Sequence, residues 1–156
     1  PFLPPALGLL MMLAIFSSHF IKPIAIVLPY PLNYIALLPI AFGVVLNILA
    51  DREFRRKGLL NESGEYQNLD KILVTSGVYS VSRNPAYVGL VLIILGLALW
   101  VGRISPWLVV AAFPLILYQF YIRIEEQQLA AEFGDRYRQY TDLVPRWFST
   151  KRKLAE

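Results

Sequence analysis

The chain has 156 residues, of which 56% are hydrophobic, and its mean hydropathy is +0.51. That composition is too apolar for an ordinary soluble domain, and the length leaves little beyond the apolar blocks, so we expect a single membrane domain over 1–156. The chain has a net charge of +4 and no cysteine, which excludes disulfides, thiol nucleophiles and cysteine-ligated metals.

Four apolar stretches approach the roughly 20 residues that cross a bilayer. They lie at about 4–21, 32–50, 86–102 and 106–122. They predict an all-α integral membrane fold with about four transmembrane helices. The first stretch lacks a basic leader region and a small-residue cleavage site, so we interpret it as a mature span. Pro23 leaves open whether this span ends before the proline or continues past a kink.

Basic residues mark one side of the membrane. Lys and Arg gather between the second and third spans and after the fourth, whereas the short loops hold only Lys22 and Arg103. The positive-inside rule then places the long loop and both termini in the cytoplasm. A basic face of this kind suits anionic lipid headgroups better than nucleic acid.

Polar residues near the first two spans suggest packing more than chemistry. His19 is the only histidine, and without a second histidine or a cysteine we expect no metal site. Gly43 and Asn47 share a face of the second span, which fits either close helix packing or one wall of a site. The polar loop 58–75 is long for so small a protein and is a candidate lid or wall.

The third and fourth spans have clear boundaries. Asn84 is placed to cap the third span, and Pro85 fits its first helical position. Gly89 and Gly96 form a stripe for close packing within or between chains. The fourth span contains Pro114, which predicts a kink, and runs on as one long helix into the cytoplasm as far as Gly134.

Three groups are predicted to meet at one depth on the cytoplasmic side. They are Tyr79 with Arg83, the free N–H groups that begin the third span, and the pair Glu125-Glu126. A helix N-terminus with an arginine attracts carboxylate or phosphate, and paired carboxylates attract ammonium groups and sugar hydroxyls. Capping, a structural ion pair and a solvated acidic face explain the same residues without a ligand.

The motifs "VTSGVYSVSRNPAYVGLVLIILG" and "RIEEQQLAAEFGDRYRQYTDLVPRW" resemble the isoprenylcysteine carboxyl methyltransferase family, in a wider group with phospholipid N-methyltransferases. The likeness covers residues 75–148, with cofactor motifs at 75–89 and 123–148. The matching residues are Gly77, Tyr79, Arg83, Asn84, Pro85, Tyr87, Gly89, Glu125, Glu126, Phe133, Gly134, Tyr137 and Tyr140.

The resemblance implies a short bacterial-type integral membrane methyltransferase of the inner membrane. It would use S-adenosylmethionine and act on a lipophilic acceptor at the bilayer. The implied cofactor-binding residues are Gly77, Val78, Tyr79, Arg83, Asn84, Pro85, Tyr87, Glu125, Glu126, Tyr137 and Tyr140. The implied catalytic residues are Arg123, Glu126 and Arg146. Either arginine would hold an anionic group of the acceptor, and a glutamate of the acidic pair would accept the proton of an amine acceptor.

The sequence does not specify the acceptor or the oligomeric state. Asn84 stands where the prenylcysteine enzymes usually carry histidine, so both an isoprenylcysteine-type carboxylate and a phospholipid amine remain possible acceptors. Two other functions also fit: an NADPH-dependent membrane reductase of the steroid-reductase type, and a four-span packing protein without enzymatic activity.

Overall fold

The computed structural model describes residues 4–18, 28–57 and 72–148, which form helices and connecting turns with no strand among them. The all-helical prediction is therefore confirmed for this part of the chain. His19, Pro23 and most of the loop 58–75 lie outside it. The elements are α1 (Pro4–Ser18), η1 (Leu32–Ala36), α2 (Leu37–Arg56), η2 (Gly77–Ser80), α3 (Pro85–Val101), α4 (Trp107–Leu117), η3 (Tyr118–Ile122), α5 (Arg123–Phe133) and α6 (Asp135–Leu143).

Two continuous helical stretches are long and apolar enough to cross a membrane. One joins η1 to α2 over Leu32–Arg56, and the other joins α4, η3 and α5 over Trp107–Phe133. The apolar parts of α1 (Ala6–Ser17) and α3 (Pro85–Val101) are shorter. At 1.5 Å per residue α3 spans about 26 Å, slightly less than the hydrocarbon core of about 30 Å. These helices fit a membrane protein, while four spans remain a prediction.

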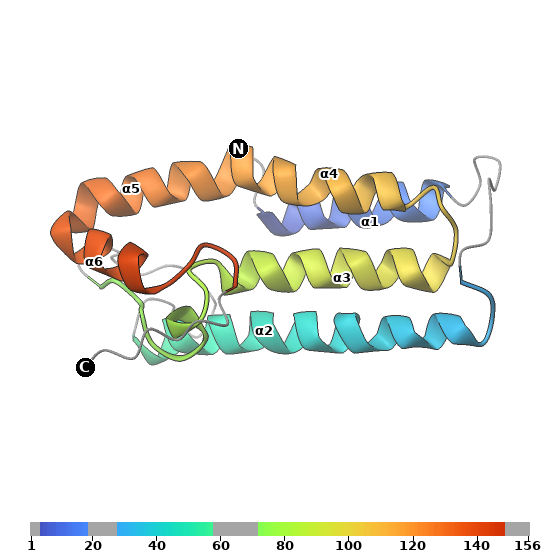
Figure 1. Ribbon diagram of the computed structural model, residues 1–156, viewed down its shortest axis with the longest axis horizontal. Coiled ribbons are helices and arrows are strands. Elements are labelled where there is room, and N and C mark those ends of the chain that lie inside the picture. The colour runs from blue at the N-terminus through green and yellow to red at the C-terminus, as the bar shows by residue number, and fades with distance from the viewer. Residues whose placement is uncertain (1–3, 19–27, 58–71, 149–156) are drawn as a thin grey trace.

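The helices pack around α3. In Figure 1, α2 lies antiparallel along one side of α3, and α1 and α4 lie along the other side. The core between α1, α3 and the long last helix consists of buried Ile15, Ile94, Phe113, Leu117 and Ile122. Because each of these elements contributes an apolar face to this cluster, the bundle fixes where the ends of α3 and α5 lie.

Glycines bring α2 and α3 into close contact. A Cβ atom added to Gly43 would lie 2.5 Å from the carbonyl oxygen of Gly89, and one added to Gly89 would lie 2.7 Å from the carbonyl oxygen of Gly43. The Asn47 amide donates to the Gly43 carbonyl at 2.9 Å, so its polar group is satisfied within α2. Gly96 faces the backbone of Ala36 in the same way. Gly43 and the stripe formed by Gly89 and Gly96 therefore pack against neighbouring helices of the same chain.

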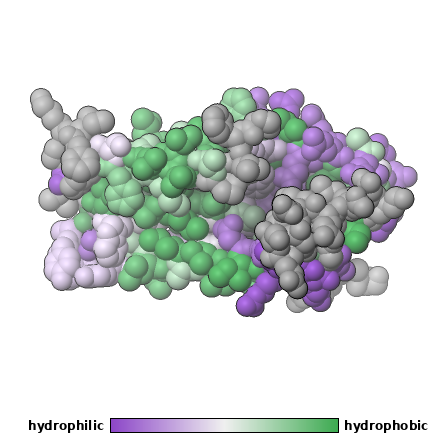
Figure 2. Space-filling model, turned by 180° about the vertical axis from the view of Figure 1, so that it is seen from behind, coloured by the Kyte–Doolittle hydropathy of each residue, from purple (hydrophilic) through white to green (hydrophobic). Residues whose placement is uncertain are grey.

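An apolar belt surrounds the bundle. Large hydrophobic side chains are exposed along α1, α2 and α4, including Leu13 (55%), Leu38 (69%) and Leu108 (79%). Figure 2 shows hydrophobic residues across the middle of the molecule and hydrophilic residues gathered at one end. At the other end, the Tyr34 ring packs edge-on against Trp100, with ring centroids 5.5 Å apart. This distribution is that of a protein with lipid around its middle and aromatic rings near one interface.

The last long helix ends where the sequence predicts. Regular α-helix continues through Pro114 to Leu117, and a π-helical turn follows at Tyr118–Ile122. The helix ends at Phe133, and Gly134 adopts φ +51 and ψ −122, a conformation that is essentially restricted to glycine. The chain then reverses into α6, which returns toward the beginning of α3 (Figure 1).

We predict that Gly89→Ala lowers the stability of the bundle by roughly 1–3 kcal/mol, because the new methyl group overlaps the α2 backbone. Thermal unfolding in detergent measures this effect. Gly8→Ala is the matched control, since its Cβ would lie 3.7 Å from the nearest atom, a Leu90 methyl carbon. An equal melting temperature for the two variants would contradict the packing described for α2 and α3.

Candidate active site

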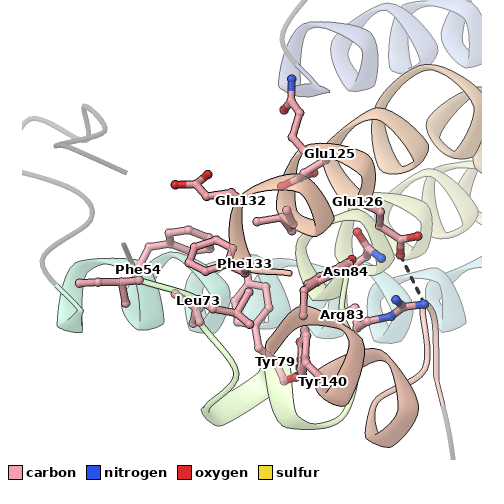
Figure 3. Close-up of a pocket in the computed structure, with 15 residues that line it drawn as sticks. Phe54, Leu73, Tyr79, Arg83, Asn84, Glu125, Glu126, Glu132, Phe133 and Tyr140 are labelled. Carbon is pink, nitrogen blue, oxygen red and sulfur yellow. Dashed lines mark hydrogen bonds and ion pairs between the residues drawn. The ribbon is translucent and has the colours of Figure 1, made fainter. Parts of the chain in front are cut away.

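A cavity of about 240 Å³ lies at the hydrophilic end of the bundle, where α2 ends, α3 begins and α5 and α6 meet (Figure 3). Its volume is slightly below the lower end of ligand pockets, which begin at about 300 Å³. It is lined by Phe54, Ile72, Leu73, Val74, Tyr79, Arg83, Asn84, Glu125, Glu126, Gln128, Leu129, Glu132, Phe133, Tyr137 and Tyr140. Segments more than 50 residues apart in sequence therefore build one site.

The turn η2 is fixed against the end of α2. Gly77 has φ +60, and a Cβ atom there would lie 2.5 Å from a carboxylate oxygen of Glu53. Ser76 donates its hydroxyl hydrogen to the same carboxylate at 2.8 Å. The Tyr79 ring then packs edge-on against Phe54, with centroids 5.5 Å apart. Glycine is thus required for the backbone at this position, and its role is to place Tyr79 in the cavity wall.

The beginning of α3 is tied to the segment that follows α6. Asn84 occupies the N-cap position and Pro85 the first turn, as predicted, but the Asn84 side chain makes no capping hydrogen bond. Its amide instead donates to the Arg146 carbonyl at 3.2 Å, and the Ser82 hydroxyl donates to the same carbonyl at 3.2 Å. The Arg83 backbone N–H donates to the Pro145 carbonyl at 3.0 Å. The expected capping role is therefore replaced by a link between two distant segments.

One carboxylate joins two arginines beside the cavity. Arg146 donates to both oxygens of Glu126, with its shortest N–O distance at 2.6 Å, and a nitrogen of Arg83 lies 3.5 Å from the same carboxylate. The hydrogen bonds to Glu126 raise the pKa of Arg146. Its guanidinium also lies over the Tyr118 ring, 5.0 Å from the centroid. The three groups together carry a net positive charge, because two guanidiniums share one carboxylate.

Helix α6 contributes two buried tyrosines. Tyr140 is 7% exposed and donates its hydroxyl hydrogen to the Tyr79 carbonyl at 2.7 Å. Tyr137 is 4% exposed, and its hydroxyl has no hydrogen-bond partner among the described residues. Burial raises the pKa of both hydroxyls, and for Tyr137 the Glu126 carboxylate raises it further. Both side chains are therefore protonated at neutral pH.

The charged side chains of the cavity lining are mostly acidic. The lining contains three carboxylates, on Glu125, Glu126 and Glu132, and one guanidinium, on Arg83. Glu126 is held by Arg146, whereas Glu125 accepts a hydrogen bond from the Tyr87 hydroxyl at 3.0 Å. In Figure 3, Glu125 and Glu132 stand above the aromatic and aliphatic wall, and Arg83 stands to the other side. Such a cavity can hold a ligand with a cation at one end and an anion at the other.

The structure brings seven of the predicted site residues into the cavity lining. These are Tyr79, Arg83, Asn84, Glu125, Glu126, Tyr137 and Tyr140. The others lie outside it. Gly77, Val78 and Pro85 are close in sequence to lining residues, Tyr87 donates to Glu125, and Arg146 donates to Glu126. Arg123 is exposed on α5.

Sequence reasoning missed part of the lining. Gln128, Leu129 and Glu132 follow the acidic pair at helical spacing and could have been found from that spacing alone. Phe133 is a residue of the matched motif, but it was not assigned to the site. Ile72, Leu73 and Val74 belong to the loop 58–75, which is predicted from the sequence as a candidate lid or wall. Phe54 carries no such signal, because tertiary packing alone brings it to the cavity.

The sequence of this helical membrane-type protein matches a known family. Residues 32–136, well over half of the chain, match the phospholipid methyltransferase family, and the chain belongs to that family. No solved structure matches the chain.

Individual relatives are more specific. A protein-S-isoprenylcysteine O-methyltransferase of Schizosaccharomyces pombe is 39% identical over 82 residues, covering 51% of this chain and 34% of that protein. Protein-S-isoprenylcysteine O-methyltransferase B of Arabidopsis thaliana is 30% identical over 115 residues, covering 67% of this chain and 56% of that protein. The chain thus spans about a third and about half of these two relatives. An uncharacterized protein of Haemophilus influenzae is 46% identical over 61 residues, covering 39% of this chain and 97% of that protein.

We predict that Glu126→Gln destabilises the protein by roughly 1–3 kcal/mol, because it leaves two guanidiniums facing each other without a carboxylate. The melting temperature in detergent gives the measurement. Glu132→Gln makes the same chemical change on the same helix at an exposed position and is the control. If both variants melt together, Glu126 does not hold the site in place.

Proposed function

We propose that the protein is an integral membrane methyltransferase that uses S-adenosylmethionine and acts on a lipophilic acceptor. Family membership supports methyltransferase chemistry. The observation that carries the proposal is the single cavity in which the approach to α3 and the acidic residues of α5 face each other. A soluble donor needs a polar cavity open to water and a lipophilic acceptor needs contact with the bilayer. The residues that line this cavity come from the ends of the helices that carry the apolar belt, and Figure 2 shows hydrophilic residues gathered at one end of the molecule, next to that belt.

The charges of the cavity fit the proposed donor. S-adenosylmethionine carries a methyl group on a positively charged sulfur. A nucleophilic oxygen or nitrogen of the acceptor bonds to this methyl group, and the sulfur leaves as a neutral thioether. Glu125 and Glu132 offer negative charge for the sulfonium and ammonium groups, and Arg83 offers positive charge for a carboxylate. Phe54 and Phe133 supply aromatic faces for a base. The chain's own contribution is to orient the reactants and exclude water around them.

A second groove suggests where the acceptor lies. It has a volume of about 330 Å³ and is lined by Pro114, Leu115, Tyr118, Arg146 and Trp147. Leu115 is 68% exposed on the apolar surface of α4, so the groove opens toward the belt. Arg146, which also holds Glu126 in the cavity wall, is one of the residues that line the groove. We therefore place the acceptor's apolar chain along α4 and its head group beside Arg146.

The residues favour different roles for the two acceptor chemistries. A carboxylate acceptor needs no base, and Arg146 is placed to hold one of its oxygens. An amine must lose a proton, and Glu125 is better placed to accept it than Glu126, because two arginines already engage Glu126. Arg123 is exposed and outside both hollows, so the proposal gives it no role in binding the acceptor.

The proposed setting follows from charge and exposure. Arg52, Arg55 and Arg56 end α2 beside the cavity, so we place the cavity and both termini on the cytoplasmic side of a bacterial inner membrane, with four spans in one domain. No observation on the described residues favours an NADPH-dependent reductase or a packing protein without activity.

We predict that the purified protein transfers a labelled methyl group from S-adenosylmethionine to a lipophilic carboxylate or amine in a membrane lipid extract. Scintillation counting and mass spectrometry of the product provide the readout. Arg83→Ala should lower the rate at least tenfold, whereas Arg103→Ala, which removes an arginine outside the cavity, should not. Stabilisation by NADPH together with absence of methyl transfer would overturn the proposal.

We predict that Leu115→Trp raises the KM for the lipophilic acceptor several-fold, because the larger ring fills the groove beside Arg146. The Kd for S-adenosylmethionine should stay unchanged. Leu108→Trp makes the same replacement two turns away on α4, at an exposed position outside the groove, and should change neither constant. Equal KM values for both variants would place the acceptor elsewhere.

A further inference from the structure

Two buried hydrogen-bond donors in the cavity wall lack an acceptor among the residues that the structure describes. The Nε–H of Arg83 and the hydroxyl of Tyr137 are both buried, and neither has a partner among the residues that the structure describes. Both residues line the cavity, and Tyr137 is 96% buried, since its exposure is 4%. Buried polar groups are nearly always paired, so an unpaired donor pair beside a cavity indicates a missing acceptor.

Within the described part of the chain, the polar groups around this pair are engaged with other partners. Tyr140 donates to the Tyr79 carbonyl, and the Asn84 amide donates to the Arg146 carbonyl. Glu126 approaches Arg83 through another nitrogen at 3.5 Å and is held by Arg146 from the other side. The guanidinium of Arg83 lies near enough to Tyr137 to oppose the rise in its hydroxyl pKa, yet no hydrogen bond of good geometry joins them.

The charge around the pair favours an anion. Arg146 neutralises Glu126, so the positive charge of Arg83 is only weakly matched by the long contact to that carboxylate. The Tyr137 hydroxyl keeps its proton because of burial, and it therefore acts as a donor to an anionic oxygen. A guanidinium N–H and a phenol O–H side by side suit a carboxylate, which accepts through several lone pairs.

We propose that Arg83 Nε–H and the Tyr137 hydroxyl together bind one carboxylate group of a reactant, with Glu126 acting as a positioning residue for Arg83. This inference rests on the proposed function and adds that Arg83 and Tyr137 recognise a carboxylate. Two reactants can supply the carboxylate: the amino-acid end of the methyl donor, or a carboxylate acceptor.

Tyr137→Phe tests the inference with little risk to the fold, because the removed hydroxyl has no partner on the described residues to lose. The melting temperature without ligand should stay the same or rise. Calorimetry in detergent compares binding of S-adenosylmethionine with binding of its decarboxylated analogue. If the donor supplies the carboxylate, Tyr137→Phe weakens S-adenosylmethionine binding about tenfold and leaves the analogue unaffected. Arg83→Lys, which keeps the charge but removes the Nε–H, should do the same.

If the acceptor supplies the carboxylate, the donor's Kd stays unchanged, and the KM for a lipophilic carboxylate rises about tenfold while that for an amine of equal chain length does not. Tyr34→Phe, which removes a hydroxyl at the opposite end of the bundle, is the control and should change no constant. Equal weakening of carboxylate and non-carboxylate ligands, or no change in any constant, overturns the inference alone. Failure of the unaltered protein to bind S-adenosylmethionine overturns the proposed function and the inference with it.

Discussion

The carboxylate of Glu126, shared between Arg83 and Arg146, holds the candidate site together. Glu126 belongs to α5, Arg83 precedes α3, and Arg146 follows α6, so one ionic cluster joins three segments that are far apart in sequence. Hydrogen bonds from Asn84 and Ser82 to the Arg146 carbonyl strengthen the same junction. Arg83 and Glu126 line the cavity and Arg146 lines the groove, so the geometry of this junction determines how the cavity and the groove lie relative to each other.

The apolar bundle gives this junction a fixed base. Close glycine contacts align α2 with α3, and the buried cluster around Ile94 and Phe113 holds the long last helix on the other side of α3. The helices therefore place their polar ends together at one end of the molecule, while the belt around their middle stays apolar (Figure 2). This arrangement explains how a helix beginning and an acidic helix end come to face a single cavity at the edge of the belt.

Local sequence signals predicted much of this fold. Proline and glycine marked where α3 begins and where α5 ends, and hydropathy located the helices. The sequence also predicted that Arg83 lies near Glu125 and Glu126, because the spans place these residues at the same depth in the membrane. The sequence did not predict which carboxylate pairs with which arginine, because that depends on the reversal at Gly134 and the path of residues 144–148. For the same reason the Asn84 side chain was assigned to a helix cap, whereas it contacts the chain's last described segment.

We propose that the methyl donor lies between the approach to α3 and the acidic part of α5. Ultraviolet cross-linking of labelled S-adenosylmethionine to the detergent-purified protein, followed by peptide mapping, tests it most directly. We expect label on peptides containing residues 72–84 and 125–140, and an excess of unlabelled donor should reduce it. Label confined to the end that carries Tyr34 and Trp100, or label that excess donor does not reduce, would contradict it.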